Sequence, residues 1–219
     1  MTRTYNARRG RMRAGRLDTM DRLLPVYAVP ERDGPIDRTA LFGRGAPLVL
    51  EIGSGMGETT VAMAVADPDR DYLAVEVHTA GVANLLGLTE AAGVANLRVV
   101  HGDAVALMRD RLDPASLAAI HVFFPDPWPK ARHHKRRLIQ PAHVRLLADR
   151  LEVGGVLHCA TDAHHYAEQM LEVLTAEPSL DNVHNGFAPR PAHRPDTRYE
   201  QRGRTAGRQS YDLVFRRTS

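Results

Sequence analysis

The chain has 219 residues, 43% of them hydrophobic and 25% charged, which suffices for one globular domain with a sizeable core. Its apolar runs stay well short of the roughly 18 residues that cross a bilayer, so we expect no membrane-spanning segment. The N-terminus lacks the apolar stretch of a secretory signal, and the single cysteine, Cys159, has no disulfide partner within the chain. We therefore expect a protein of the reducing cytoplasm.

The net charge of +3 conceals three strongly basic segments. Residues 1–22 carry seven arginines against two acids, residues 130–137 carry five lysines and arginines and no acid, and residues 190–219 carry eight arginines against three acids. An organellar transit peptide would also be rich in arginine and poor in acids, but an RNA-contacting arm suits residues 1–22 better. Three such clusters favour a nucleic-acid partner over a merely solvated surface.

In chain order, the pattern predicts a basic arm, flexible or helical, in residues 1–30 and one domain in residues 31–219. After a loop-rich lead-in over residues 25–47, short apolar runs alternate with helical patterns. The predicted strands cover residues 48–52, 72–76, 97–100, 118–124 and 155–160, and the predicted helices cover 58–66, 80–92, 104–109, 135–151 and 165–175. This alternation predicts an α/β fold with a mainly parallel sheet and helices on both faces. A last strand-like run, residues 210–215, would join a sheet edge in the antiparallel sense.

A glycine-rich turn follows the first predicted strand. Gly53, Gly55 and Gly57 stand in the order G-x-G-x-G, and Glu58 occupies the slot where a dinucleotide fingerprint has its third glycine. Glu51 lies just before the first glycine. A carboxylate there would repel a pyrophosphate, but it can accept hydrogen bonds from an ammonium group. The pattern therefore favours S-adenosylmethionine, which has no phosphate, over NAD.

Two further acids follow the next two predicted strands. Glu76 stands 23 residues after Gly53, a spacing at which an acid binds the ribose hydroxyls of either cofactor. Asp103 could accept from an adenine amino group, or it could simply cap the next helix. Ligands in open α/β sheets bind at the carboxyl ends of the strands. We therefore expect Glu51, Glu76 and Asp103 to line one cofactor site.

The segment 123–137 is the most informative stretch of the chain. Pro125 and Pro127 restrict the backbone around Asp126, the only tryptophan, Trp128, follows, and a dense cationic run comes next. A stiffened acid beside a flat aromatic ring and several cations suits a nucleobase with its phosphates. Trp128 could stack on a base, a contact worth about 1–3 kcal/mol, or it could plug the core.

The chain resembles the tRNA (guanine-N7)-methyltransferase family of the bacterial single-subunit type. The resemblance extends over nearly the whole chain and includes the basic arm around residues 8–12 and 24–27. Its strongest motif is the Pro-Asp-Pro-Trp-Pro-Lys run of residues 125–130 with the basic residues that follow. The other matching motifs cover residues 51–57, 76–82, 102–104, 160–162 and 194–203. The resemblance implies a Rossmann-like class I methyltransferase fold.

The resemblance also implies the role of individual residues. Glu51, Glu76, Asp103 and Asp126 would contact S-adenosylmethionine, together with the glycines of the turn, and Asp126 would be the catalytic residue. Those expected to bind the substrate guanosine are Lys130, Asp162, Thr197, Arg198, Tyr199 and Glu200. Those expected to contact RNA are Arg132, His133, His134, Lys135, Arg136 and Arg137. The substrate of this family is the guanosine at position 46, in the variable loop of tRNA.

Two rival interpretations remain at the level of sequence: a methyltransferase for another nucleobase or a small amine, and a non-catalytic RNA-binding protein on a Rossmann-like fold. The basic segments argue against the small amine, and the run of acids argues against the non-catalytic protein. The pairs His133-His134 and His164-His165 are adjacent, so each pair projects in different directions, and no cysteine cluster accompanies them. We therefore expect no metal. We also expect a monomer or homodimer without an obligatory protein partner.

Overall fold

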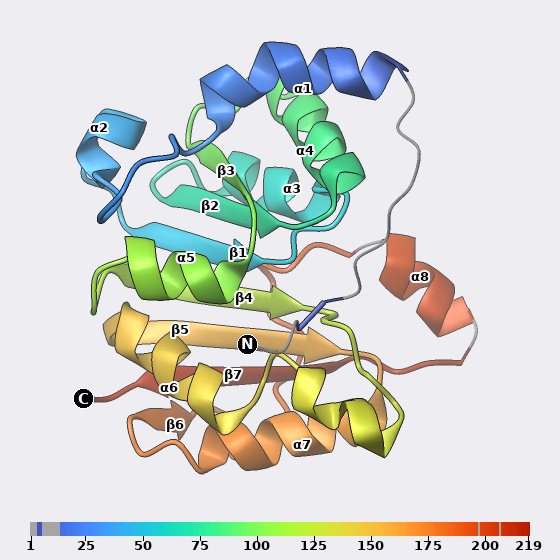
Figure 1. Cartoon of the computed structure of the whole chain (residues 1–219). Coiled ribbons are helices and arrows are strands. Elements are labelled where there is room, and N and C mark those ends of the chain that lie inside the picture. Colours follow the sequence, from blue (N-terminus) through green and yellow to red (C-terminus); the bar gives the residue numbers. More distant parts are fainter. Residues whose placement is uncertain (1–3, 6–13, 197, 206) are drawn as a thin grey trace. The chain divides into compact units, whose positions relative to one another are not determined.

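The computed structural model describes residues 4–5, 14–196, 198–205 and 207–219, and at residues 14, 198, 199, 202 and 204 it describes the backbone alone. Thr197 and the arm residues 6–13 thus lie outside the described residues. The described chain forms two compact units (Figure 1). The N-terminal unit ends at Asp113, and the C-terminal unit contains Pro114–Ser219 with Thr4 and Tyr5. Within the described ranges, no helix is long and apolar enough to cross a membrane.

The N-terminal unit contains three parallel strands in the order β3-β2-β1. All residues of the first two strands are buried, as expected for parallel strands covered on both faces. The strands are β1 (Leu48–Ile52), β2 (Asp71–Glu76) and β3 (Leu97–His101), and the helices are α1 (Ala14–Tyr27), α2 (Arg38–Phe42), α3 (Glu58–Ala66), α4 (Thr79–Ala91) and α5 (Ala104–Arg111). The predicted strands and helices of residues 48–109 are confirmed to within two residues at each end.

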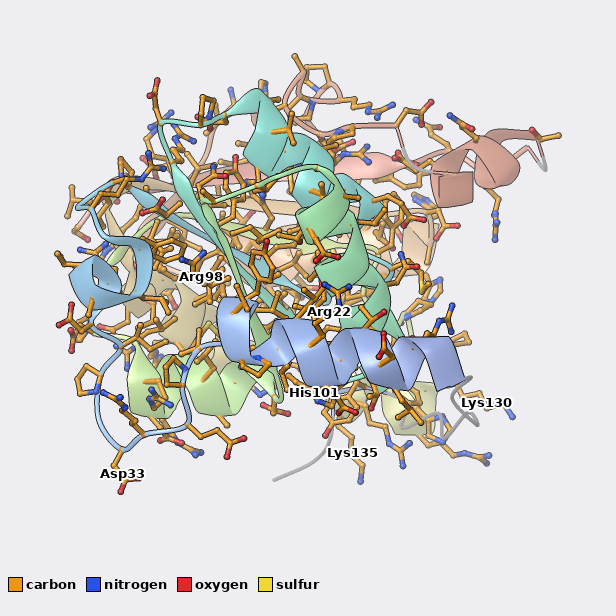
Figure 2. The ribbon with its side chains drawn as sticks, turned by 90° about the horizontal axis from the view of Figure 1, so that it is seen from above. Arg22, Asp33, Arg98, His101, Lys130 and Lys135 are labelled. Carbon is orange, nitrogen blue, oxygen red and sulfur yellow. The ribbon has the colours of Figure 1, made fainter. Side chains whose placement is uncertain are left out.

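Helix α1 lies in the predicted basic arm, and it packs along α4 (Figure 1). Met20 and Leu23 are buried. Arg22, whose position on α1 Figure 2 shows, forms an ion pair with Glu90 of α4. The apolar positions of α1 therefore anchor this part of the arm, while its arginines and acids supply the outer surface.

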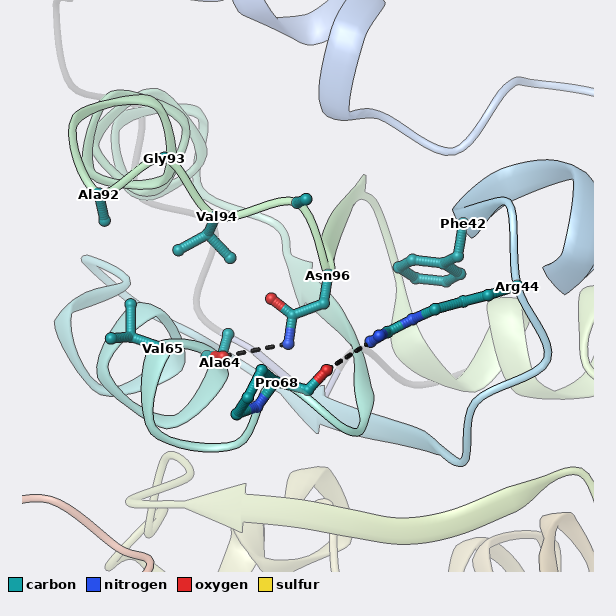
Figure 3. A pocket seen from close by; sticks show the side chains of 10 residues that line it. Phe42, Arg44, Ala64, Val65, Pro68, Ala92, Gly93, Val94 and Asn96 are labelled. Atoms are coloured by element: carbon teal, nitrogen blue, oxygen red, sulfur yellow. Dashed lines mark hydrogen bonds between the residues drawn. The ribbon is translucent and has the colours of Figure 1, made fainter.

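A pocket of about 420 Å³ lies in the N-terminal unit, and it is lined by residues that precede the three strands. Asn96, just before β3, donates hydrogen bonds to the carbonyl oxygens of Ala64 and Arg70 over 3.0 and 2.8 Å. Arg44 donates to the carbonyl of Pro68 over 2.8 Å (Figure 3). Ligands of open α/β sheets bind at the opposite, carboxyl ends of the strands. We therefore treat this pocket as part of the framework and not as the cofactor site.

The C-terminal unit contains four strands in the order β4-β5-β7-β6. Strands β4 and β5 are parallel, whereas β7 is antiparallel to both β5 and β6. The strands are β4 (Leu117–Phe123), β5 (Leu151–Thr161), β6 (Leu180–Asn182) and β7 (Tyr211–Arg217), and the helical segments are η1 (Ala131–Arg136), α6 (Pro141–Arg150), α7 (His164–Thr175) and α8 (Arg198–Thr205). The antiparallel direction of the last strand is confirmed. Its predicted edge position is wrong, because the short β6 pairs with its outer side.

The helix predicted for residues 135–151 is also wrong in its bounds. A 3-10 segment, η1, ends at Arg136, and α6 begins only at Pro141, because proline suits the first position of a helix and not its interior. Leu151 is already the first residue of β5, which starts four residues earlier than predicted. The β4–β5 pairing has a register shift at this point, and Gly154, with a φ of 87°, lies within it. Because of the glycines at this point, the predicted strand begins only at residue 155.

Candidate active site

The glycine-rich turn leads from β1 into α3 in the N-terminal unit, as the sequence predicts. Gly53 donates its backbone N–H to the carbonyl of Val75 over 2.8 Å, and Gly57 donates to Ser54 over 2.9 Å. All three glycines of the turn have positive φ values, of 77°, 58° and 84°. These bonds hold the turn against the end of β2.

Two glycines are needed because of close packing. A Cβ on Gly57 would lie 2.6 Å from Cδ1 of Leu85 in α4, and a Cβ on Gly81 would collide with the carbonyl oxygen of Gly55. Beside Gly53 and Gly55, in contrast, the described residues leave open space within 4 Å of the Cβ position. The turn is thus packed tightly from behind and presents accessible backbone in front, which lets a ligand approach closely.

Glu76 ties this turn to the end of β2. One of its carboxylate oxygens accepts a hydrogen bond from the N–H of Gly55 over 2.8 Å, and the other accepts from Val77 and His78 over 2.7 Å each. The side chain is 5% exposed. Glu76 therefore shapes the turn itself, a function that its strand-end position alone did not reveal.

Glu51 is a buried acid near the carboxyl end of β1, with 3% of its surface exposed. Burial raises the pKa of this carboxyl, the Thr60 hydroxyl lowers it and the nearby charge of Glu76 raises it, and together they bring the pKa to about 7. Its Oε2 has no hydrogen-bond partner among the described residues. A buried acceptor of this kind fits the ammonium group of an amino-acid moiety, and it is poorly suited to a phosphate.

Asp103 follows β3 and caps α5, where it accepts a hydrogen bond from the N–H of Ala106 over 3.0 Å. The capping interpretation of this residue is thus confirmed, and its contact with a cofactor stays a prediction. Glu51 and Glu76 nevertheless lie at or near the carboxyl ends of β1 and β2, and Asp103 directly follows the carboxyl end of β3, the next strand of the same parallel sheet. The N-terminal unit therefore supplies the predicted set of acids and the open glycine turn together.

In the C-terminal unit, the segment after β4 holds Asp126 in a strained and firmly fixed loop. Phe124 and Trp128 have φ values of 50° and 44°, a region that costs a bulky residue about 1–3 kcal/mol. Phe124 donates its N–H to the carbonyl of Ala160 over 2.7 Å, and Arg137 donates from Nε to the carbonyl of Pro127 over 2.9 Å. Asp126 is exposed at the centre of this loop.

Arg137 braces this loop from inside. It is only 2% exposed, and its guanidinium lies 4.8 Å from the ring centroid of Tyr166. The assignment of Arg137 to the RNA surface is therefore corrected, because a guanidinium that is buried and bonded to the loop cannot reach a phosphate. The exposed cations of the segment are Lys130, Arg132 and Lys135, and Lys130 and Lys135 are labelled in Figure 2. His133, His134 and Arg136 are half-buried.

Trp128 is half-buried, so it is neither a core plug nor a fully open stacking surface. Its Nε1 donates to the carbonyl of Thr4 over 3.2 Å, and the guanidinium of Arg136 lies 5.0 Å from the ring centroid. His133 contacts the ring edge-on. Trp128 thus joins the Asp126 loop to the basic segment within the C-terminal unit.

A buried ion network around Arg194 escaped the sequence analysis. Arg194 donates to both carboxylate oxygens of Asp212 in β7 over 2.8 and 2.9 Å, and it pairs with Glu200 in α8 over 2.6 Å. His158 of β5 lies 2.7 Å from the same Asp212 carboxylate. Burial alone would raise the pKa of Asp212, but His158 and Arg194 hold this pKa below its usual value. The only sequence signal was Arg194 at the start of the matching 194–203 motif.

The residues predicted to bind guanosine have separate environments. Asp162, just after β5, pairs with Arg208 over 3.4 Å. Glu200 is 3% exposed and bonded to Arg194, so it fixes the first turn of α8. Arg198 and Tyr199 begin that helix, and their side chains, like the whole of Thr197, lie outside the description.

The raised pKa of Glu51 predicts how the stability of the ligand-free protein depends on pH. Because the folded carboxyl holds its proton up to about pH 7 and the unfolded one releases it near pH 4.5, the folded state binds more protons between these values. Stability should fall by about 3 kcal/mol as pH rises through this window. Glu51→Gln should remove this fall and weaken S-adenosylmethionine binding.

Denaturant unfolding at a series of pH values measures the first effect, and calorimetric titration measures the second. Glu58→Gln, which removes an exposed carboxylate seven residues away, is the matched control. An unchanged pH profile in Glu51→Gln would refute the account of this buried acid.

The fold is shared with solved methyltransferase structures. The 16S rRNA methyltransferase KamB matches 88% of this chain and 99% of its own, with a TM-score of 0.63 and 17% sequence identity. The [4+2]-cyclase SpnF matches 92% of this chain and 93% of its own, with a TM-score of 0.57 and 16% identity. At these identities the likeness establishes the Rossmann-like fold, and the cyclase shows that the fold by itself does not decide the reaction.

Sequence comparisons are more specific. Residues 45–213 match the model of a family described as "Putative methyltransferase". The tRNA (guanine-N(7)-)-methyltransferase of Streptomyces coelicolor is 54% identical over 219 residues, which cover 98% of this chain and 80% of that protein. The protein of the same name from Nitrosospira multiformis is 49% identical, over 98% of this chain and 94% of its own. The chain belongs to the tRNA (guanine-N7)-methyltransferase family.

Proposed function

We propose that this protein transfers the methyl group of S-adenosylmethionine to N7 of a guanosine in tRNA, at position 46 of the variable loop. The observation that carries the proposal is the high identity, over almost the whole chain, to relatives named for this activity. That span includes the glycine turn, the Asp126 loop and the Arg194 segment. The protein is an S-adenosylmethionine-dependent enzyme, and a non-catalytic role is not favoured.

In the N-terminal unit, the residues that would hold the cofactor are Glu51, Glu76, Asp103 and the glycine turn. Glu51 offers a buried acceptor to the ammonium group, and the open backbone at Gly53 and Gly55 allows close approach. When bound, S-adenosylmethionine supplies an electrophilic methyl group on a positively charged sulfur. Glu76 keeps the turn in place through three backbone hydrogen bonds, and this role is independent of any contact that it makes with the ribose hydroxyls of the cofactor.

Guanine N7 has a free lone pair, so no proton need leave before the N–CH3 bond forms and the S–CH3 bond breaks. The protein must therefore align the reactants and stabilise charge, which passes from the sulfonium to the purine. We assign this role to Asp126. Its exposed carboxylate can stabilise the positive charge that develops on the purine, or it can accept hydrogen bonds from the N1–H and amino group of the base. The strained loop and the bond from Arg137 to Pro127 hold the backbone on either side of Asp126.

On the substrate side, we propose that Lys130, Asp162 and residues 197–200 bind the guanosine. Glu200 contributes by positioning α8 through Arg194, since its carboxylate is buried in that pair. Side chains reach guanine N7 poorly in the deep groove of A-form RNA. The target base must therefore be accessible or extruded, which suits a variable loop and a nearby aromatic ring.

We further propose that the enzyme acts in the cytoplasm, as a monomer or homodimer, without an obligatory protein partner. The basic arm of residues 1–30 would add contacts to tRNA, because its arginines outnumber its acids.

Transfer of a labelled methyl group to tRNA tests the proposed reaction. The substrate should be tRNA transcribed in vitro, because cellular tRNA is already modified, and the labelled nucleosides should then be identified. We expect label in 7-methylguanosine alone. Label in another nucleoside, or none, would contradict the proposal.

The same assay tests the role of Asp126. Asp126→Asn keeps the shape of the side chain but removes its charge, so turnover should fall by at least about a hundredfold, the scale of removing one transition-state stabilising group. Affinity for S-adenosylmethionine, measured by calorimetry, should change little. Near-normal turnover with intact cofactor binding would exclude an essential role for this charge.

The exposed cations of the basic segment should govern the salt dependence of tRNA binding. Each phosphate contact that is lost reduces the magnitude of the slope of log K against log salt by about 1. Replacing both Arg132 and Lys135 by glutamine should therefore reduce this magnitude by about 2. Arg109→Gln, an exposed arginine of α5 outside the three basic segments, is the control and should leave the slope unchanged. If the double variant keeps the wild-type slope across a salt series, these residues do not touch phosphate.

A further inference from the structure

Three histidines from separate segments meet in the C-terminal unit. His121 lies in β4, His158 lies in β5, and His193 lies in the loop before α8. His121 and His158 are paired in the β4–β5 register, and one ligand nitrogen from each of the three residues lies within 4.8 Å of the others. Because the three residues are far apart in the chain, the adjacent histidine pairs of the sequence do not reveal this group.

The distances in this cluster suit a shared ion. The ring centroids are 5.1 Å apart for His158 and His193, 5.4 Å for His121 and His193, and 5.9 Å for His121 and His158. Imidazoles that share one tetrahedral zinc ion, with Zn–N bonds of about 2.0–2.1 Å, have centroids about 5 Å apart. The ring centroids are thus close to this spacing, and the ligand nitrogens, which lie within 4.8 Å of one another, would draw together around a common ion.

A neighbouring carboxylate sets the tautomer of His158. Its Nε2 lies 2.7 Å from Oδ1 of Asp212, and because a carboxylate only accepts, this nitrogen carries the proton. The lone pair of His158 is then on Nδ1, which lies 3.1 Å from Nε2 of His193. Neighbouring ligand nitrogens on tetrahedral zinc are about 3.3 Å apart. A carboxylate that orients a histidine in this way is typical of the surroundings of metal-binding histidines.

We propose that His121, His158 and His193 form a binding site for a divalent transition metal of the zinc type, with water as the fourth ligand. His193 is exposed and belongs to a loop, so it provides both the entry path and the ligand that can move. The positive charge of Arg194 is compensated by Asp212 and Glu200.

The site goes beyond the proposed methyl transfer, and it revises our expectation that the chain binds no metal. The ion would join the loop before α8 to β4 and β5, on the segment that also carries Arg194. Its role is structural, because methyl transfer to a free lone pair requires no Lewis acid. Binding should therefore be visible without any measurement of activity.

Metal binding to the untagged, full-length protein, first stripped with a chelator and desalted, tests the proposal. Titration with Co²⁺ should produce the intense visible bands of tetrahedral cobalt, and Zn²⁺ should displace them at one equivalent. His193→Ala removes the exposed ligand and should weaken Zn²⁺ binding at least about tenfold, since even changes around a ligand cost about 10–100-fold. His184→Ala, an exposed histidine of the same unit, is the matched control.

The comparison of these two variants separates the site from the other histidines of the chain. We expect the cobalt bands to vanish in His193→Ala and to persist in His184→Ala. Absence of tetrahedral bands in the wild-type protein, or equal Zn²⁺ affinities for wild type and His193→Ala, would overturn the proposal. Because His193 is exposed, its replacement should not prevent folding, and circular dichroism of the variant checks this.

Discussion

The bond between Arg194 and Asp212 organises much of the C-terminal unit. An arginine that is 2% exposed and a carboxylate that is 3% exposed are stable together because each is paired with opposite charge. Asp212 accepts from both Arg194 and His158, and Arg194 also holds Glu200. Loss of one partner would leave a buried charge uncompensated, at a cost of about 3–5 kcal/mol. Strand β7, strand β5 and the segment that leads into α8 are thereby joined at one point.

This network explains how an irregular segment can present substrate-binding residues. Between α7 and β7 the chain has little regular structure beyond β6 and α8 among the described residues, so backbone hydrogen bonds alone do not fix it. Arg190 adds to the anchoring, since it donates to the carbonyl of Arg194 and pairs with Asp196. The same principle recurs in the N-terminal unit, where the carboxylate of Glu76 fixes the glycine turn. In both units a buried charge gives a loop the rigidity that binding sites need.

The sequence predicted the regular part of the fold because that part depends on local patterns. The runs around β1 and β2 are apolar since both faces of the strands are covered, and the turn after β1 needs positive φ values, which glycines adopt readily. Errors arose where distant residues decide the outcome. Arg137 reads as one more cation of a basic run, yet Tyr166 and the Pro127 carbonyl bury it. The short β6 has no distinctive composition, so the position of β7 could not be foreseen.

For the candidate site, the sequence nominated the acids, whose roles stay predictions, but it did not reveal the contacts that hold them. Motif spacing indicated Glu51, Glu76 and Asp126, but the backbone bonds of Glu76 and the strain beside Asp126 depend on the folded loops. The histidine cluster was invisible for the same reason, because its members are 37 and 35 residues apart in the chain. Contacts between segments at such separations leave no mark on local periodicity.

Whether guanine N7 is the methyl acceptor can be decided with one altered substrate. A tRNA transcript in which 7-deazaguanosine replaces the variable-loop guanosine has a C–H group in place of the N7 lone pair and is otherwise almost unchanged. If N7 is the acceptor, this tRNA should bind with near-normal affinity and accept no methyl group there, while the matched guanosine transcript is methylated. Methylation of the deaza nucleoside at the normal rate would contradict N7 as the acceptor.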